Sequence, residues 1–510
     1  VAGGPCNNAG AGRVAARHLF EWGAQVRVYA LRERSDSQWT QTVDMGVPCG
    51  SVNEDEDFEA LEALLSGAEA IVDALLGTGS SRPIEGDLAQ IMTRLAAMRS
   101  RTVKPKLVAV DLPTGLDADS GRLDPLAVAA DETVTFHAPK VGLYLQPGAS
   151  AAGSVQQVEI GIPSGLDEDL QTAVLERRAA KALLPDRPAD GHKGTFGRVL
   201  VIAGSARYPG AAILAARGAY RAGAGLVTIA TPQSIASHMV AAVPEATLLP
   251  LPEHDEGVIS GFAAWEVVRD ELPGIDSVVI GCGFGRHDHS GKFVREFLIS
   301  PEVSAVKGVV VDADGLNLLA ADMSGLPNAV APVVLTPHPG EMGTLTGTTA
   351  DDVQRQRLTL SRDCAAEWNC HVVLKGANTV VASPDHRARV SEVAQPALAT
   401  AGTGDVLSGT IGALIAQGLE PFDAATLGVY LHGDAGNRAA RARGTIGVTA
   451  GDVADQLAMA ARSLAGEEPV EAPSMGGGFG MGAGDVGGLG QLAGAGGLGG
   501  GLEGLLGGQQ

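Results

Sequence analysis

The stretch ATAGTGDVLSG, residues 399–409, places one carboxylate, that of Asp405, behind a run of small residues and ahead of an apolar segment. Apolar residues follow at helical spacing, which predicts that Asp405 lies at the start of a helix with free backbone amides. Such amides attract an anion, and Gly404 lets a phosphoryl group approach closely. Because Asp405 repels a phosphate, its useful role is as the base for a hydroxyl that attacks the phosphorus. These residues alone leave open a helix-capping aspartate without a catalytic role.

Three further segments place polar groups directly after an apolar strand, which is where open α/β sheets bind ligands. They are VVVDADGLNLL (309–319), VLTPHPGEM (334–342) and VVLKGANTVVASPD (372–385). In the first segment Asp312, Asp314 and Asn317 are candidates, and helix-start capping is the alternative for the two acids. No G-x-x-x-x-G-K-[ST] loop occurs in the sequence, which excludes a P-loop nucleotide site.

The N-terminal half repeats this arrangement. GGPCNNAGAGRVAARHL (3–19) joins a strand to a helix through small residues, which suits a phosphate of a dinucleotide. Further strand-end motifs are VDALLGTG (72–79), AVDLPTGLDADSG (109–121) and TFHAPKVGLYLQPG (135–148). Asp111 is either an acid/base group or a strand-end cap.

The elements that position these motifs alternate between short strands and helix-length segments, a pattern typical of parallel sheets with crossover helices. We expect helices at 12–23 and 57–67, and strands at 25–31, 70–77, 106–113, 133–136, 197–204, 225–231, 277–283, 308–315, 332–337 and 371–376.

The predicted fold class is α/β, with two three-layer α/β/α domains. The expected segments are a first domain at 1–162, a polar linker at 163–190, a second domain at 191–465 and a Gly-rich disordered tail at 466–510. The chain opens on VAGG without an initiator Met, so we expect the first elements of the N-terminal domain to be missing.

Charge and composition limit the partners. The formal net charge is −22, so neither a nucleic-acid surface nor a membrane surface is expected. No apolar run reaches the ~18 residues that cross a bilayer, and no leader pattern opens the chain, so we expect a soluble, cytoplasmic protein. The five cysteines are scattered without a C-x-x-C pair, which favours buried thiols over disulfides or a zinc site.

The C-terminal motifs resemble the ribokinase-like superfamily, and within it the ADP-dependent dehydratase of hydrated NADH and NADPH. The resemblance covers about residues 175–465 and is carried by HKGTFGRVLVIAGSARYPGAAILAARGAYRAGAGLVTIATP (192–232), GCGFGR (281–286), TPHPGEM, LKGANT and AGTGDVL. It implies that ADP phosphorylates the ring hydroxyl of the S epimer and that phosphate then leaves, so that AMP and the repaired cofactor result.

The same resemblance implies residue roles. Asp405 would take the hydroxyl proton, and Mg²⁺ would bridge the phosphates. The nucleotide would be bound by Lys375, Gly376, Ala377, Asn378, Thr379 and Gly404. The hydrated cofactor would be lined by Ala211, Gly285, His338 and Asp405. A ribokinase-like kinase that releases a stable phosphate ester of a small alcohol, with a non-catalytic N-terminal binding domain, is the alternative.

Residues 1–162 resemble the epimerase that interconverts the R and S forms of hydrated NAD(P)H. That resemblance implies a K⁺ site at Asn8, Asp73 and Thr114, and an acid/base group at Asp111 with Lys140 as a helper. The substrate would lie against Asn7, Asn8, Ala9, Gly10, Ala11, Gly77, Thr78, Gly79, Pro83 and Asp111. The two activities are known as fused halves of one polypeptide, so the whole chain resembles that fused family, and we expect a homo-oligomer.

One departure concerns the first loop. The family pattern is N-N-G-G-D-G, whereas this chain reads NNAGAG, so that Ala9 replaces a glycine and Ala11 replaces the acid. The lost carboxylate removes a ribose or ring contact. An N-terminal half that is weakened, or that binds ligand without catalysis, therefore stays open. Neither the preference between NADH and NADPH nor that between ADP and ATP follows from the sequence.

Overall fold

The structure, a computed structural model, describes residues 1–4, 7–32, 36–79, 82–163, 165–167, 169–254 and 257–467. Most of the tail expected from residue 466 onward lies outside these residues. Residues 1–467 form one compact unit. No helix in the described ranges is long and apolar enough to span a bilayer.

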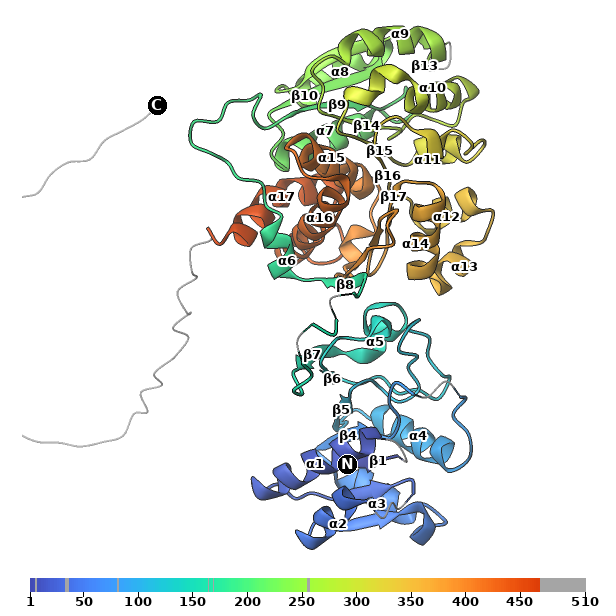
Figure 1. Ribbon diagram of the computed structural model, residues 1–510, viewed down its shortest axis with the longest axis vertical. Coiled ribbons are helices and arrows are strands. Elements are labelled where there is room, and N and C mark those ends of the chain that lie inside the picture. Colours follow the sequence, from blue (N-terminus) through green and yellow to red (C-terminus); the bar gives the residue numbers. More distant parts are fainter. Residues whose placement is uncertain are drawn as a thin grey trace, which may run out of the picture. The chain divides into compact units, whose positions relative to one another are not determined.

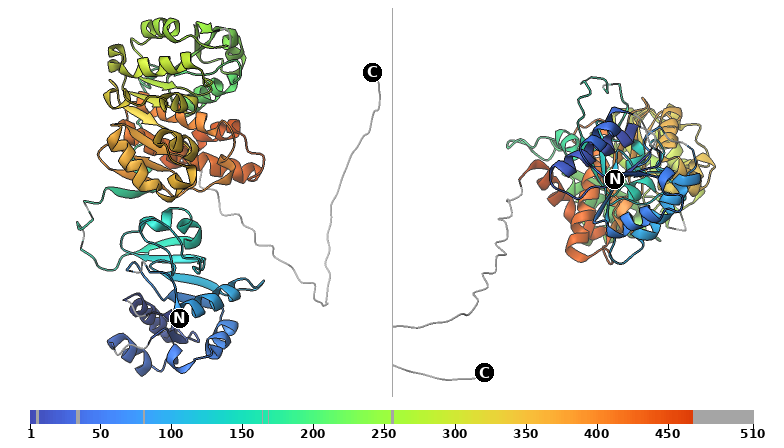
Figure 2. Two further views of the ribbon diagram at one scale, coloured as in Figure 1. Left: turned by 90° about the vertical axis from the view of Figure 1, so that its right-hand side faces the viewer. Right: turned by 90° about the horizontal axis from the view of Figure 1, so that it is seen from below.

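The first sheet has seven strands in the order β3-β2-β1-β4-β5-β6-β7, and every strand pair is parallel. The strands are β1 (Ala2–Gly3), β2 (Val28–Ala30), β3 (Cys49–Ser51), β4 (Ala70–Ala74), β5 (Lys106–Val110), β6 (Glu132–Phe136) and β7 (Ser154–Val158). The α-helices are α1 (Asn7–Glu21), α2 (Ser37–Asp44), α3 (Glu59–Gly67), α4 (Gly86–Arg99) and α5 (Gly148–Ala152). The chain's N-terminus lies among the blue elements of this sheet, in keeping with the interior position of β1 (Figure 2).

This topology has a switch point between β1 and β4, because the chain runs from β1 outward to β3 and then returns to the other side of β1. Ligands of open parallel sheets bind beyond the carboxyl ends of the strands at such a point. The predicted loop residues after β1 and β4 therefore meet at one place.

The second sheet has ten strands in the order β11-β10-β9-β14-β15-β16-β17-β18-β19-β8, of which only β18 runs antiparallel to both its neighbours. The strands are β8 (Thr172–Leu175), β9 (Arg198–Ile202), β10 (Leu226–Pro232), β11 (Thr247–Leu251), β14 (Ser277–Ile280), β15 (Gly308–Val311), β16 (Val333–Leu335), β17 (His371–Leu374), β18 (Val380–Ala382) and β19 (Ala388–Ser391). The hairpin β12 (Glu253–His254) and β13 (Val258–Ile259) stands apart. Strand β8 lies within the segment expected to be a linker.

Helices cover both faces of this sheet. They are α6 (Arg177–Ala182), α7 (Pro209–Arg221), α8 (Gln233–Ala242), α9 (Gly261–Glu271), α10 (Asp288–Ile299), α11 (Asp314–Leu319), α12 (Pro339–Thr346), α13 (Ala350–Arg355), α14 (Arg357–Glu367), α15 (Thr403–Ala416), α16 (Pro421–Arg443) and α17 (Ala450–Ala465). Figure 1 shows α15, α16 and α17 on one side of the strands and α11, α12 and α14 on the other.

The sequence explains this three-layer packing. Successive residues of a strand point to opposite faces, and in β9 Val199 and Val201 belong to one buried cluster while Leu200 and Ile202 belong to another. The strand therefore reads as a continuous apolar run, as expected where both faces are covered. The predicted α/β fold class is confirmed.

Candidate active sites

Helix α15 presents Asp405 in its first turn, and its own sequence fixes that position. Gly402 caps the helix with φ 89°, a left-handed conformation that favours glycine. Farther along, a Cβ on Gly409 would lie 1.9 Å from the Ala215 carbonyl oxygen, and one on Gly412 would lie 2.4 Å from a methyl of Val279. These glycines let α15 pack closely against α7 and β14, which fixes the position of the helix that carries Asp405.

The end of β17 brings Lys375 beside this helix start. Lys375 Nζ lies 2.6 Å from Asp312 Oδ1, at the end of β15. Ser408 Oγ donates to the other oxygen of Asp312 at 2.6 Å. A Cβ on Gly404 would be 3.2 Å from Lys375 Nζ, so the ammonium passes close to the helix start. The structure thus brings together Asp405, Gly404 and Lys375, which the sequence singled out in separate segments.

Asp405 also lies beside Cys282, a residue that the sequence treated only as a buried thiol. Ligand atoms of Cys282, Asp312 and Asp405 all lie within 4.8 Å of one another. Burial raises the pKa of Asp405 to about 7, and the negative charge of Asp312 adds to the rise, while the Cys282 thiol and Lys375 oppose it. A base whose pKa lies near neutrality is well matched to proton transfer at cellular pH.

Lys375 remains charged. Burial alone would lower its pKa, but Asp312 and Glu341 raise it above the usual value. Glu341, which the sequence did not single out, is 3.7 Å from Lys375 Nζ, and burial raises its pKa to about 7. A fixed positive charge beside a helix start is the arrangement that stabilises a phosphate.

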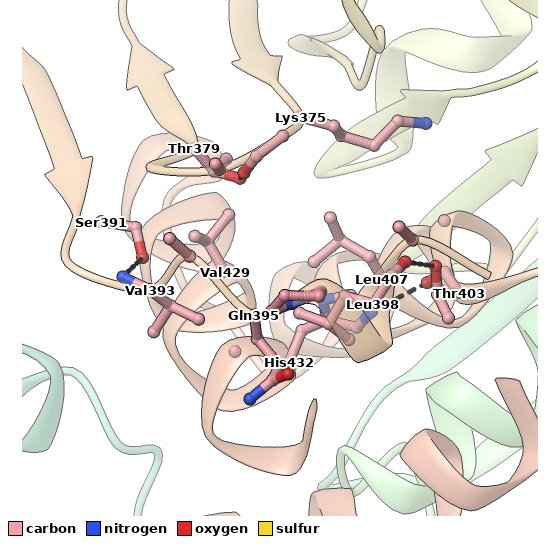
Figure 3. Close-up of a pocket in the computed structure, with 17 residues that line it drawn as sticks. Lys375, Thr379, Ser391, Val393, Gln395, Leu398, Thr403, Leu407, Val429 and His432 are labelled. Atoms are coloured by element: carbon pink, nitrogen blue, oxygen red, sulfur yellow. Dashed lines mark hydrogen bonds between the residues drawn. The ribbon is translucent and has the colours of Figure 1, made fainter. Parts of the chain in front are cut away.

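A cavity of about 290 Å³ opens next to Lys375 and Gly404. Its walls are mainly apolar, with a few polar groups, as in sites that hold an aromatic base. The lining residues are Lys375, Gly376, Ala377, Thr379, Ser391, Val393, Ala394, Gln395, Pro396, Leu398, Ala399, Thr403, Gly404, Leu407, Val429, His432 and Gly433. Figure 3 shows Lys375 and Thr379 on one wall and Leu398 and His432 on the opposite wall.

Asn378, expected in the nucleotide site, does not line this cavity. Its backbone has φ 56°, and its side-chain amide donates to the Ser391 carbonyl at 3.0 Å. Asn378 therefore shapes the turn between Lys375 and Thr379 instead of facing the cavity.

Two buried residues that the sequence did not reveal support the cavity walls. Burial lowers the pKa of His432 to about 4, so the ring is neutral, and its Nε2 donates to the Thr403 carbonyl at 2.9 Å. Arg357 donates to the carbonyls of Leu374 and Lys375 at 2.8 and 3.2 Å. His432 thus fixes the backbone next to Gly404, and Arg357 fixes the backbone at Lys375. Neither role could be predicted from the sequence, because both depend on tertiary contacts.

The residues expected to line the hydrated cofactor follow β9, β14 and β16. His338 caps α12, with Nδ1 accepting from Gly340 and Glu341 amides at 3.0 and 3.2 Å, so Nε2 carries the proton. Asp314 accepts the Gly285 amide at 2.9 Å. Ala211 lies in the first turn of α7.

Asn317 and Asp314 have structural partners. Asn317 donates back to the Ala313 carbonyl at 3.2 Å within its own helix, and Asp314 fixes the loop at Gly285.

In the first sheet, the three residues expected to bind K⁺ are gathered in one network. Thr114 Oγ1 donates to Asp73 at 2.7 Å, and the Thr114 amide donates to its other oxygen at 2.9 Å. Asn8 donates to the carbonyls of Leu76 and Val110, each at 2.7 Å. Asp73 is 1% exposed, and burial raises its pKa despite the bonds from Thr114. Among the described residues, no Lys, Arg or His forms an ion pair with Asp73.

Asp111 and Lys140 form a second pair in this half. Lys140 Nζ is 2.5 Å from Asp111 Oδ1, and it also donates to the Phe136 carbonyl at 2.9 Å. Asp111 has φ 69°, an unusual backbone conformation for a residue other than glycine, of the kind found at functional sites. The side chains of both residues are mostly buried.

The predicted loop after β1 is largely helical, since α1 already begins at Asn7. Ala9 is 1% exposed and packs beneath β1. Ala11 is half-buried, and Gly10 lies between these two alanines in the same turn of α1. A Cβ on Gly77 would approach the Asn8 side chain at 3.3 Å, so the loops after β1 and β4 meet. Thr78, Gly79 and Pro83 are exposed beyond that contact.

Comparisons with known proteins agree with this arrangement. Residues 199–459 match a family model described as NAD(P)H-hydrate dehydratase, and residues 1–142 match one described as YjeF-related protein N-terminus. A bifunctional NAD(P)H-hydrate repair enzyme of Moorella thermoacetica is 40% identical over 476 residues, covering 92% of this chain and 88% of that protein. The corresponding enzyme of Thermofilum pendens is 37% identical over 467 residues, covering 90% of this chain and 87% of that one.

A solved structure adds support for the second half. The ADP/ATP-dependent NAD(P)H-hydrate dehydratase of Bacillus subtilis, co-crystallised with ATP and Mg²⁺, superposes with a TM-score of 0.50 at 29% identity, covering 58% of this chain and 99% of that one. A ribokinase-like protein of Enterococcus faecalis, at 24% identity and a TM-score of 0.51, supports the fold alone and covers 58% of this chain and 97% of its own.

Proposed function

Because the chain belongs to the family of bifunctional NAD(P)H-hydrate repair enzymes, we propose that it repairs hydrated NADH and NADPH. Its second half uses ADP to dehydrate the S epimer, and its first half interconverts the R and S epimers. The observation that carries this proposal is that Lys375 and Gly404 line a largely apolar cavity, while Asp405, which directly follows Gly404, lies beside Asp312, the partner of Lys375.

In the dehydratase reaction Asp405 removes the proton from the ring hydroxyl of the S hydrate. The hydroxyl oxygen forms a bond to the β-phosphorus of ADP, the bond from that phosphorus to the bridging oxygen breaks, and AMP leaves. The ring nitrogen then supplies an electron pair as the carbon–oxygen bond breaks. Phosphate departs, the neighbouring carbon loses a proton, and the double bond is restored.

Lys375 and the start of α15 stabilise the charge of the phosphates during transfer. Asp312 holds the ammonium of Lys375 at 2.6 Å, which keeps the cation directed toward Gly404. Oxygen atoms of Asp312 and Asp405 suit a hard cation such as Mg²⁺, which when bound neutralises charge on phosphate oxygens.

The proposal assigns acid/base chemistry in the first half to Asp111 and Lys140, which share a close contact. It assigns K⁺ to the site of Asn8, Asp73 and Thr114. The fit rests on the buried carboxylate of Asp73, which no described cationic side chain neutralises. Oxygen atoms such as the Thr114 hydroxyl lie beside it and are the ligands that a hard cation prefers.

Product analysis separates this proposal from a small-molecule kinase. With S-hydrate, ADP and Mg²⁺, phosphorus NMR should show free phosphate and AMP while the absorbance of reduced nicotinamide returns. Accumulation of a stable phosphate ester without that absorbance supports the kinase instead. Replacing ADP by ATP in the same assay establishes the preferred donor.

The first half is tested on its own substrate. The pure R epimer should lose chiral purity faster than it does spontaneously when the full chain is added. Retention of chirality at the spontaneous rate would make the N-terminal half a binding module. We also propose a homo-oligomeric, cytoplasmic enzyme, whose assembly light scattering measures directly.

A further inference from the structure

Basic and histidine side chains from three loops gather beyond the carboxyl ends of β9 and β14. We name this set the basic rim; it comprises Arg207, His254, Arg286, His287 and His289. The ring centroids of His254 and His289 are 4.6 Å apart, those of His287 and His289 are 5.2 Å apart, and those of His254 and His287 are 5.3 Å apart. The three rings therefore form one cluster, although they come from β12 and from the start of α10.

The remaining members of the rim are tied to this cluster by backbone contacts. The Ala206 amide donates to the Gly257 carbonyl at 2.9 Å, which joins the loop of Arg207 to the hairpin of His254. A Cβ on Gly283 would lie 2.9 Å from the Tyr208 carbonyl oxygen, which joins the same loop to the segment that carries Arg286. The backbones of the three segments therefore adjoin, and the Arg207 guanidinium lies over the Tyr208 ring, 5.4 Å from its centroid.

The rim adjoins residues that the proposed function places at the hydrated cofactor. Arg286 directly follows Gly285, and its Nε is 3.5 Å from Asp314 Oδ1, the acid that fixes the Gly285 amide. The charge of Arg286 contributes to the lowered pKa of His338, after burial and Lys375. The Arg286 side chain is 70% exposed, so its guanidinium can take a further partner. No rim residue lines the cavity next to Lys375.

An anionic dinucleotide needs such a surface on this protein. The chain has a formal net charge of −22, so its overall field opposes a polyanionic substrate. Among the described residues the acids near the rim are Glu253, which accepts from Ser234 at 2.6 Å, Asp314, and the exposed Asp288 at the start of α10. In the sequence Asp255 and Glu256 also follow His254 directly, so Arg207 and Arg286 must act locally against several acids. Arginine presents a planar fork that matches phosphate oxygens, and imidazoles add further donors.

We propose that the basic rim binds a phosphate group of the hydrated dinucleotide, as a subsite separate from the ADP cavity. This inference rests on the proposed function for the identity of the ligand. The shared chemistry is a phosphate, which belongs either to the pyrophosphate of both substrates or to the 2′-phosphate of hydrated NADPH alone.

The test compares two variants with the full-length wild type. One is Arg286→Gln, and the other is the triple variant His254→Gln, His287→Gln and His289→Gln. We expect KM for the hydrate to rise about tenfold in Arg286→Gln, as for loss of one charge-assisted hydrogen bond, with a smaller change in kcat. Arg269→Gln is the matched control, because Arg269 pairs only with the neighbouring Asp270 among the described residues, and it should leave KM unchanged.

The two substrates distinguish the two phosphates. A rise for both hydrates assigns the pyrophosphate, and a rise for hydrated NADPH alone assigns the 2′-phosphate. An unchanged KM for both in Arg286→Gln and in the triple variant overturns the proposal. Calorimetric titration of each protein with NADPH and with NADH needs no turnover. An inactive wild type would contradict the proposed function. Equal affinities of wild type and variants for NADPH and for NADH would contradict phosphate binding at the basic rim, whether or not the wild type is active.

Discussion

The two halves of the molecule each bury an aspartate at the end of a parallel strand, but they neutralise it differently. Asp312, in the second half, is 1% exposed and lies 2.6 Å from the ammonium of Lys375. Asp73, in the first half, is equally buried but is surrounded by hydroxyl and amide donors. A buried charge is costly unless it is paired or coordinates a metal. The proposed K⁺ would bring to Asp73 from solution the positive charge that Lys375 provides beside Asp312 in the second half.

The two carboxylates proposed as catalytic, those of Asp111 and Asp405, show the opposite contrast. Asp111 is in direct contact with Lys140 at 2.5 Å, whereas Asp405 makes no ion pair within the described ranges and its pKa rises to about 7. A carboxylate that must accept a proton benefits from a raised pKa, while an acid and base acting as a pair benefit from a shared contact.

Removing Asp405, the proposed base of the second half, should have the largest effect. Asp405→Asn should lower dehydratase kcat by about 10²–10⁴-fold, the usual contribution of a general base, while ADP binding measured by calorimetry stays close to wild type. Epimerisation of the R form should be unaffected, which serves as the internal control. Full dehydratase turnover in this variant would remove Asp405 from the reaction.

Making the second half resemble the first tests the role of Lys375. Lys375→Met leaves Asp312 buried without its cation, and breaking a buried pair in this way costs about 3–5 kcal/mol. Urea unfolding should show this loss, and dehydratase activity should fall with it. The double variant Lys375→Met with Asp312→Asn should recover stability without recovering activity. Wild-type stability in the single variant would show that the fold tolerates buried Asp312 without the positive charge of Lys375.

The first half should respond to K⁺ where the second does not. Hydrogen–deuterium exchange in KCl, compared with choline chloride at equal ionic strength, should slow in peptides covering residues 70–79 and 109–116. A ligand present at 100 times its Kd stabilises the state that it binds by ~2.7 kcal/mol. Asp73→Asn is the control and should abolish the difference. Equal protection in both salts would contradict a K⁺ site.

The raised pKa of Asp405 gives a dependence of activity and stability on pH. Dehydratase kcat/KM should rise as pH passes through about 7, because only the ionised carboxylate accepts a proton. A folded pKa above the unfolded value of 3.8 means that stability is highest at low pH and is lost as pH rises toward 7. Asp405→Asn should therefore have a higher melting temperature than wild type at pH 8, and the difference should be smaller at pH 5. An equal difference at the two pH values would contradict the raised pKa of Asp405.

The smallest effect is expected at Ala11, which replaces the acid of the family pattern in the loop after β1. Ala11→Asp restores the acid of the family pattern at a half-buried position, and epimerase activity should increase several-fold through one added polar contact. Ala11→Asn, which has the same shape without charge, is the matched control. An unchanged rate in both would show that Ala11 does not limit the epimerase.

Much of the fold was predictable because its strands are short apolar runs ending in polar motifs. The expected strands coincide with β2, β4, β5, β6, β9, β10, β14, β15, β16 and β17. The convergence of Lys375 and Asp405 also followed, since the carboxyl ends of parallel strands meet with helix starts at one edge. The edge strands β8 and β11 were missed, because short strands on a sheet edge lack a continuous apolar pattern.

The supporting residues of the sites were not predictable, for a physical reason. Cys282, Glu341, Arg357 and His432 act through contacts with segments distant in the sequence, and none belongs to a local pattern that signals its partner. The burial of Cys282 was expected and is confirmed, but its contact with Asp405 and the burial of the other three became apparent only when the sheet and α15 were assembled. The helical start of α1 at Asn7 was also missed, because a run of small residues indicates a loop as readily as a tightly packed helix.

The central claim is that ADP is consumed to turn a ring hydroxyl into a departing phosphate. One measurement tests it most directly: pure S-hydrate and ADP are incubated with the full chain, and AMP and reduced nicotinamide are counted in the same sample. We expect one AMP for each cofactor restored and no recovery of the cofactor without nucleotide. Recovery of the cofactor without AMP, or AMP formation without recovery, would contradict it.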